Sequence, residues 1–124
     1  MRAARSYGAV DRETSVVVAD PMGLIKLIYD RLTQTIVLAG DALETGDIEA
    51  RSKAINRAIE LIDLGLINAL DFERGGDLSK RLSAHYMSWI ARLSQANAQS
   101  SIETLKAVEG EVRMIKSAWD ELSH

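Results

Sequence analysis

The chain has 124 residues, of which 47% are hydrophobic and 27% charged, and it contains no cysteine. This length suits one domain with one core, and the lack of cysteine excludes disulfides, thiolate metal sites and cysteine nucleophiles. A net charge of −3 with interspersed acids and bases argues against nucleic acid binding, while the lack of a long apolar run or a signal-peptide pattern predicts a cytoplasmic protein with no membrane insertion.

Residues 1–19 predict a flexible, irregular leader in front of the folded domain. They include three arginines, two serines and one glycine, and the stretch 15–18 consists of serine and three valines. Such a stretch prefers extended backbone to helix. Tyr7 is the one residue of the leader that we expect to act as an anchor. The rest of the chain, residues 20–124, is predicted to form a single helical-bundle domain.

The first helix is predicted to begin at Asp20 and Pro21. Aspartate is a good N-cap, and proline at the first helical position loses no hydrogen bond. The helix ends at Gly46, and Asp47 caps the helix that follows. The apolar residues in between recur at helical spacing: Ile25, Ile28, Leu32, Ile36, Ala39 and Leu43.

The second helix is predicted to run from Asp47 past Leu70 to the pair Gly75 and Gly76. Either glycine can adopt the positive φ that ends a helix, and Asp77 is then the N-cap of a third helix. The inward stripe of the second helix comprises Ile55, Ala58, Ile59, Ile62, Leu66 and Leu70. Leu61, Leu64 and Ile67 add apolar surface on its flanks, so the stripe is wider than one helix contact needs.

The third and fourth helices follow the same pattern and complete the bundle. The third has apolar residues in steps of three and four: Leu78, Leu82, Tyr86, Trp89, Leu93 and Ala96. Ser100 and Glu103 form a capping-box pattern that opens the fourth, whose stripe comprises Ile102, Leu105, Val108, Val112, Ile115, Trp119 and Leu122. Four helices of this kind joined by short turns predict an all-α, antiparallel up-down four-helix bundle.

The sequence offers little for catalysis. His85 does not follow a glutamate by three residues, and the single Glu-x-x-His pair, Glu121 with His124, falls short of the two pairs that a di-iron bundle requires. The pair Gly75 and Gly76 lacks the lysine and hydroxyl of a phosphate-binding loop. A small helical mutase of the chorismate type would need several interior cations, whereas the basic residues other than Arg31 fall outside the inward stripes. We therefore expect no metal, no cofactor and no enzymatic activity.

The surplus apolar surface points to a partner instead. Leu61, Leu64 and Ile67 broaden the second helix, while Met87 and Ile90 flank the third. Such residues can form grooves that accept amphipathic helices from another chain. A self-associating structural bundle that dimerises through the same surface is the alternative, and the free chain is expected to be a monomer or a weak homodimer.

Several stretches together resemble the flagellar secretion chaperones that hold flagellin, the FliS family. The segment Ala19-Asp20-Pro21 followed by Leu27-Ile28-Tyr29-Asp30 is similar to the family's Ala-Ser-Pro start and Leu-Tyr-Asp signature. A second set has the order and spacing of another family signature: Leu70-Asp71, Gly75-Gly76, Leu82, Tyr86-Met87, Leu93 and Ala96-Asn97. The pair Ala118-Trp119 matches near the end. The chain departs from the family at Ile28, at Arg81 and at His85, where the family has leucine, asparagine and leucine.

The resemblance implies a function without a chemical step. Members of the family bind the disordered C-terminal segment of flagellin in the cytoplasm, prevent its premature polymerisation and aid its delivery to the flagellar export gate. The segment orders partly into helices on the bundle, at a cost in conformational entropy that keeps the affinity moderate. On this basis the expected flagellin-binding residues are Tyr7, Leu61, Leu64, Ile67, Met87 and Ile90.

Overall fold

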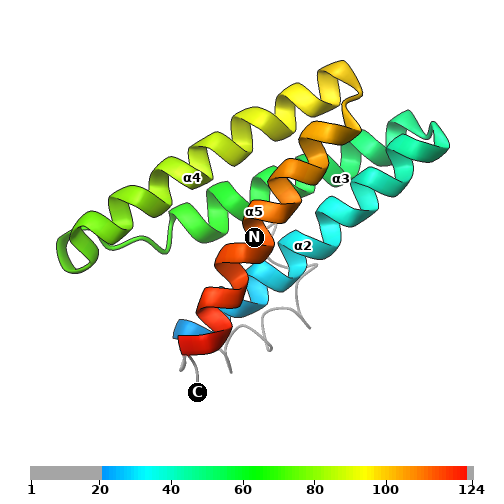
Figure 1. The fold of residues 1–124 in the computed structure, drawn as a ribbon. Helices are drawn as coiled ribbons and strands as arrows, with labels where there is room; N and C mark the ends of the chain where they lie inside the picture. Colours follow the sequence, from blue (N-terminus) through cyan, green and yellow to red (C-terminus); the bar gives the residue numbers. More distant parts are fainter. Residues whose placement is uncertain (1–20, 123–124) are drawn as a thin grey trace, which may run out of the picture.

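The computed structural model describes residues 21–122 and places four helices in up-down order, with successive helices running in opposite directions (Figure 1). Helix α2 spans Pro21–Thr45, and α3 spans Ile48–Glu60 and continues as the π-helix η2, Leu61–Ile67. Helix α4 spans Phe72–Gln99, and α5 spans Ile102–Leu122. The predicted all-α antiparallel bundle is confirmed. The leader with Tyr7, the predicted cap Asp20 and His124 lie outside the described residues.

The turn between α2 and α3 is formed as the sequence predicts. Gly46 has a φ of 78°, a value that glycine adopts without strain. The Asp47 side chain accepts a hydrogen bond from the backbone N–H of Ala50 at 3.0 Å and so caps α3. Pro21 is the first residue of α2, as predicted.

The second helix differs from the prediction because it changes from α to π geometry at Leu61 and ends at Ile67 rather than near the glycine pair. A π-helix fits more residues into each turn, which explains the wide apolar stripe. Within η2, Ile62 and Leu66 are buried. Gly65 lies against α2, where an added Cβ would come within 3.2 Å of Ile28 Cδ1. A glycine here therefore lets the two helices approach closely.

The prediction that Gly75 and Gly76 separate two helices is confirmed in part, because the backbone is non-helical at Gly76, but a first helical turn already begins before the glycine pair and its N-cap is not Asp77. Asp71 caps α4 by accepting from the backbone N–H of Arg74 at 3.0 Å, because the π-helix has already ended and the chain turns back at residues 68–70. Gly76 does have positive φ, at 50°, and interrupts α4 after its first turn. The Ser79 hydroxyl donates to the Asp71 carbonyl at 2.9 Å and holds this turn in place.

The last cap lies one residue later than predicted. Ser100 is the left-handed C-cap of α4, with φ 52°, and its N–H bonds to the Ala96 carbonyl. Ser101 instead caps α5, since its Oγ accepts from the Thr104 N–H at 3.2 Å and lies 2.9 Å from Thr104 Oγ1. Ser100 therefore ends α4 and Ser101 begins α5, so the chain reverses direction within two residues.

This end of the bundle is also closed by side chains. Arg51 of α3 donates to Asn97 Oδ1 of α4 at 2.9 Å and to Ser100 Oγ at 3.0 Å. Ser52 donates to the same Asn97 oxygen at 3.3 Å. The start of α3 is therefore fixed to the end of α4, and we call this the closed end.

The core runs through the middle of the bundle. Most positions of the predicted stripes are buried, and so is Tyr29, whose hydroxyl lies 2.8 Å from that of Tyr86. Leu78 and Leu122, however, were predicted to face inward and are 57% and 69% exposed. The fully buried large side chains are Trp89, Tyr29, Tyr86, Leu32, Ile36, Ile55, Ile62, Leu66, Leu93, Leu105, Val108 and Val112.

Leu78 and Leu122 are exposed because the helices separate at one end. From the closed end, α4 with η2 runs in one direction and the pair of α2 and α5 in another, so that the first half of α4 diverges from the last half of α5 (Figure 1). We call this the open end. None of the helices within residues 21–122 combines the length and hydrophobicity needed to cross a bilayer.

Candidate functional site

The structure places five of the six residues predicted to bind a partner on η2 and α4, two elements that pack against each other. Leu64 and Met87 are 65% and 57% exposed. Leu61, Ile67 and Ile90 are half-buried and pack against the core. We call these five residues the η2–α4 face. Its apolar surface is real, but the five residues line neither of the two hollows described next, and its role as a binding face stays a prediction.

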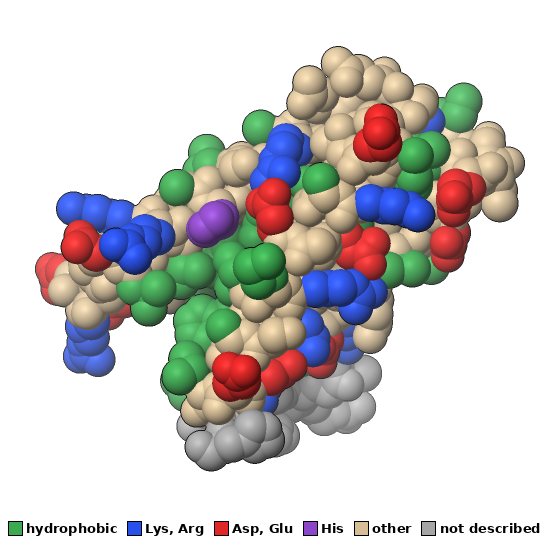
Figure 2. Space-filling model, viewed as in Figure 1, with side chains coloured by type: hydrophobic (Ala, Val, Ile, Leu, Met, Phe, Trp, Pro, Cys, Tyr) green, Lys and Arg blue, Asp and Glu red, His purple; other side chains and the backbone are tan. Residues whose placement is uncertain are grey.

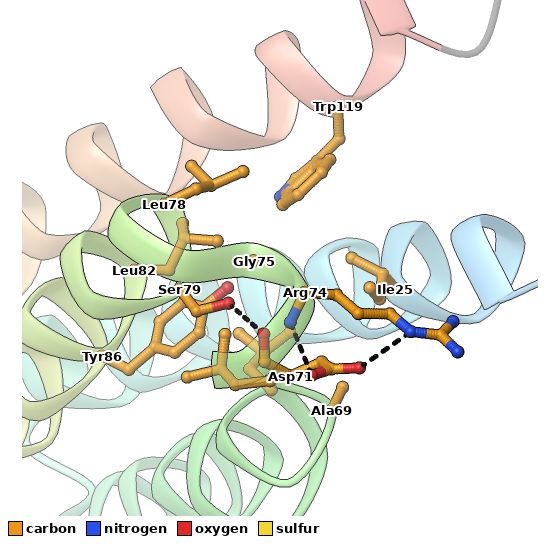
Figure 3. Close-up of a pocket in the computed structure, with 12 residues that line it drawn as sticks. Ile25, Ala69, Asp71, Arg74, Gly75, Leu78, Ser79, Leu82, Tyr86 and Trp119 are labelled. Atoms are coloured by element: carbon orange, nitrogen blue, oxygen red, sulfur yellow. Dashed lines mark hydrogen bonds and ion pairs between the residues drawn. The ribbon is translucent and has the colours of Figure 1, made fainter.

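A hollow that sequence reasoning missed lies at the open end, between α4, α2 and the end of η2. It has a volume of about 300 Å³. Figure 3 shows Trp119 extending from α5 toward Leu78 and Leu82 of α4, with Ile25 of α2 on the opposite side. The apolar side chains that line this α2–α4 hollow are Ile25, Leu66, Leu70, Leu78, Leu82 and Trp119.

A second hollow of about 290 Å³ continues the first between α4 and α5. Figure 2 shows hydrophobic side chains gathered in this recess. Leu78, Leu82 and Trp119 line both hollows, so the two hollows adjoin. We call them together the open-end groove. The apolar residues of the second part are Leu78, Leu82, Ile115, Ala118, Trp119 and Leu122.

Two residues of the predicted apolar stripes, Leu78 and Leu122, line this groove. Leu78 opens the third stripe and Leu122 closes the fourth, and each continues the helical spacing beyond the region where the opposite helix lies close enough to cover it. Periodicity alone cannot separate a buried position from one that faces an open groove. Both were therefore predicted to be core residues.

Polar groups lie beneath the apolar lining. Tyr86 lines the α2–α4 hollow, and its hydroxyl is bonded to that of the fully buried Tyr29. Burial raises the pKa of Tyr86, and the neighbouring Tyr29 raises it further. Burial raises the pKa of Tyr29 as well, although nearby donors on Tyr86 and Trp119 oppose this shift in part. Both hydroxyls therefore stay protonated and can donate hydrogen bonds.

Trp119 carries an unusual buried donor. Its Nε1 atom is buried, and no acceptor among the described residues meets hydrogen-bond distance and angle with it. The ring lies near Tyr29, with a centroid distance of 6.3 Å. A buried N–H without an acceptor costs about 1 to 3 kcal/mol, so the site is not fully satisfied in this state.

Charged side chains surround the groove. Arg74 pairs with its own cap residue Asp71 at 3.8 Å. Arg81 and His85 line the part between α4 and α5, and Arg81 has no ion pair within residues 21–122. Arg81 and His85 are two of the positions at which the sequence departs from the family signature. Both lie at the groove and outside the core.

A network next to the groove joins α4 to α5. Arg92 donates to both Glu111 oxygens, at 2.8 and 2.6 Å, and the Trp89 indole donates to Glu111 Oε1 at 3.0 Å. Hydrogen bonding from Arg92 lowers the pKa of Glu111, with further lowering by Trp89 and His85. The same contact raises the pKa of Arg92. This network fixes the helix spacing where the groove begins.

The geometry suits binding of an apolar segment. Every described arginine and lysine is exposed or half-buried, so the interior between residues 21 and 122 holds no cationic clamp for a dicarboxylate. The same residues contain no cluster of three or more acidic or histidine side chains able to hold a metal ion. An elongated apolar groove next to exposed leucine and methionine is the common form of a helix-binding site.

Comparison with known proteins gives a consistent result. The family model described as "Flagellar protein FliS" matches residues 3–124. The chain is 37% identical over 119 residues to the flagellar secretion chaperone FliS of Salmonella typhimurium (strain LT2), covering 96% of this chain and 88% of that protein. It is 36% identical over 124 residues to the flagellar secretion chaperone FliSB of Pseudomonas aeruginosa, covering 100% and 98%. Identity to FliS of Escherichia coli (strain K12) is 27% over 117 residues, covering 94% and 86%.

Proposed function

Because the chain belongs to the FliS family of flagellar secretion chaperones, we propose that it binds the C-terminal segment of flagellin in the cytoplasm, prevents premature polymerisation and delivers flagellin to the flagellar export gate. The observation that carries the proposal is the pair of adjoining, mainly apolar hollows that share Leu78, Leu82 and Trp119 as lining residues. Such a groove provides apolar contact area, and binding through it requires no catalytic group.

The driving force is burial of apolar side chains. Each leucine or methionine that leaves water on binding contributes about 1.5 to 3 kcal/mol. Ordering of a disordered segment offsets part of this gain, so a large contact yields a moderate affinity. That balance fits a chaperone, because a cargo that is bound too tightly would not be released for export.

The binding surface in this proposal has two parts. One is the η2–α4 face with its exposed Leu64 and Met87, to which Tyr7 is added as a further predicted ligand contact. The other is the open-end groove. The α2–α4 hollow reaches the end of η2 through Leu66, so one extended segment can pass from the groove to the face and wrap around the bundle.

Sedimentation of the full chain with and without a synthetic flagellin C-terminal peptide tests the proposal. We expect the free chain to sediment as a monomer or a weak dimer and to form a one-to-one complex with the peptide. A chain that is a stable dimer by itself and does not bind the peptide contradicts the proposal. That result would favour a self-associating bundle, for which the exposed Leu78 and Leu122 provide apolar surface.

A further inference from the structure

The hollow between α4 and α5 has basic side chains but no acidic one in its described lining. Arg81 and His85 of α4 line it together with apolar residues and Trp119, and none of the described lining residues is an aspartate or a glutamate. Arg81 and His85 are four positions apart, so they lie on one face of the helix with their Cβ atoms about 5 to 6 Å apart. Both side chains are exposed. Two groups that can bind an anion therefore lie side by side at this hollow.

Glu111 of α5 does not supply that anion. Its pKa is lowered first by Arg92, then by Trp89 and least by His85. Its Oε1 atom accepts hydrogen bonds from Trp89 and Arg92, and its Oε2 atom accepts another from Arg92. The His85 ring packs near the Trp89 ring, with a centroid distance of 6.2 Å. Because the Glu111 carboxylate is already engaged, His85 can accommodate a second one.

Arg81 is also available for a new partner. It has no ion pair within residues 21–122, and this includes Asp77, which lies four positions earlier on the chain. Its guanidinium therefore carries a positive charge at the edge of an apolar hollow without a carboxylate partner among the described residues.

We propose that Arg81 and His85 are specificity-determining residues that recognise a carboxylate on the flagellin segment bound at the open end. This inference rests on the proposed function and adds the chemical class of side chain, aspartate or glutamate, that the segment carries where it crosses the hollow between α4 and α5. A guanidinium can form two parallel hydrogen bonds with one carboxylate, and a protonated imidazole can donate to the same group.

An entirely apolar segment would bind less well at this position. Atoms that cover Arg81 remove water from its charge, and this loss is unfavourable unless a group of opposite charge replaces the water. A carboxylate offsets the loss, whereas a lysine or arginine of the ligand would be repelled. Since Arg81 and His85 are exposed, water still screens the contact, and we expect it to contribute about two- to fivefold in affinity.

Two neighbouring cations of α4 form a matched pair for testing the role of Arg81. Lys80 is exposed like Arg81 but lines neither hollow of the open-end groove. In calorimetric titration of the full chain with the synthetic flagellin C-terminal peptide, we expect Arg81→Gln to weaken binding about two- to fivefold. Lys80→Gln removes the same charge and should bind as the wild type does. Thermal unfolding checks that both variants fold.

Peptides in which each aspartate or glutamate is replaced in turn by its amide identify the recognised carboxylate. One of these peptides should bind the wild-type chain about two- to fivefold more weakly and bind Arg81→Gln as well as the original peptide does, because the partner of that carboxylate is already gone. Losses that are the same in the wild type and in Arg81→Gln for every peptide overturn the inference.

The pH dependence of binding tests the role of His85. Lowering the pH from 8 to 5.5 protonates an exposed histidine and leaves the peptide's carboxylates ionised. The charged groups of the chain around His85 are Arg81 on α4 and Glu111 on α5, with Arg92 bonded to Glu111, and all three keep their charge over this range. We expect wild-type affinity to rise about two- to fivefold at pH 5.5 and His85→Gln to show no such rise.

The direction of this pH effect is decisive. A protonated histidine covered by an apolar or basic part of the ligand would weaken binding, so a lower affinity at pH 5.5 that disappears in His85→Gln overturns the inference. If the wild-type chain does not bind the peptide at any pH, the proposed function itself fails. If it binds the peptide but Arg81→Gln binds equally well, the proposed function stands and the recognition of a carboxylate is wrong.

Discussion

Glu111 joins two helices through one carboxylate. It accepts hydrogen bonds from Arg92 and Trp89 of α4, while it belongs itself to α5. Its folded pKa is lowered, first by Arg92. Since the ionised form is favoured in the folded state, the stabilisation is present above the ordinary pKa of 4.5 and is lost as the pH falls through the lower folded value.

Glu111→Gln should therefore reduce stability at neutral pH and flatten its acid dependence. The side chain is 40% exposed, and after allowance for solvent screening we expect a loss of about 1 kcal/mol at pH 7. The difference should shrink as the pH falls below 4.5. Urea unfolding over this pH range measures both effects. Glu109→Gln, which breaks an ion pair within α5, is the control and should cost less than about 0.5 kcal/mol.

Gly75 has a packing reason to lack a side chain. A Cβ at this position would collide with Ser79 Oγ, whose hydrogen bond to Asp71 holds the first turn of α4. We expect Gly75→Ala to destabilise the chain by about 1 to 3 kcal/mol. The control is Gly110→Ala, an exposed position inside α5 with no atom near the new Cβ, which should stabilise by about 0.5 to 1 kcal/mol. Equal effects in the two variants would contradict the proposed collision.

At the scale of elements, the sequence predicted the helices better than their ends. Pro21, Gly46 and Asp47 identify one turn because each has a clear local role. The turn before α4 was misplaced because two aspartates, Asp71 and Asp77, are equally good caps, and only the π-helix decides between them by ending the preceding helix early. Residue propensities do not predict a π-helix, because its formation depends on how the helix packs in the folded protein.

The candidate site was predictable only in part. Surplus apolar residues on the second and third helices predicted the η2–α4 face, and Leu64 and Met87 are indeed exposed. The open-end groove depends on how far two helix pairs separate, which is a property of the packed bundle. The buried position of Trp119 Nε1 could not be foreseen either, because it depends on how α5 packs against α2 and α4.

Two exposed methionines allow a clean test of the η2–α4 face. Met87 of α4 is 57% exposed and belongs to this face, whereas Met114 of α5 is 73% exposed and lies outside it. We expect Met87→Glu to weaken flagellin peptide binding by about tenfold or more, since a charge would lose its hydration in an apolar contact. Met114→Glu should bind as the wild type does. Both should unfold within about 0.5 kcal/mol of the wild type, and calorimetric titration compares their affinities.

For the molecule as a whole, binding should have the thermodynamic signature of apolar burial. The proposed surface is mainly leucine, isoleucine, methionine and tryptophan, and the chain carries a small net charge of −3. We therefore expect a clearly negative heat-capacity change on peptide binding and an affinity that varies little with salt. Titration calorimetry at several temperatures and salt concentrations measures both. A heat-capacity change near zero with strong salt dependence would indicate an electrostatic contact instead.

The side-chain contacts of Arg51, Asn97 and Ser100 have a mechanical consequence. They join α3 to α4 beside the α2–α3 and α4–α5 turns, whereas within residues 21–122 Glu111 is the residue whose side chain joins α4 to α5. Helices that are fixed to each other at the closed end can move farthest apart at the open end. We therefore expect small tilts of whole helices to change the width of the open end more than that of the closed end.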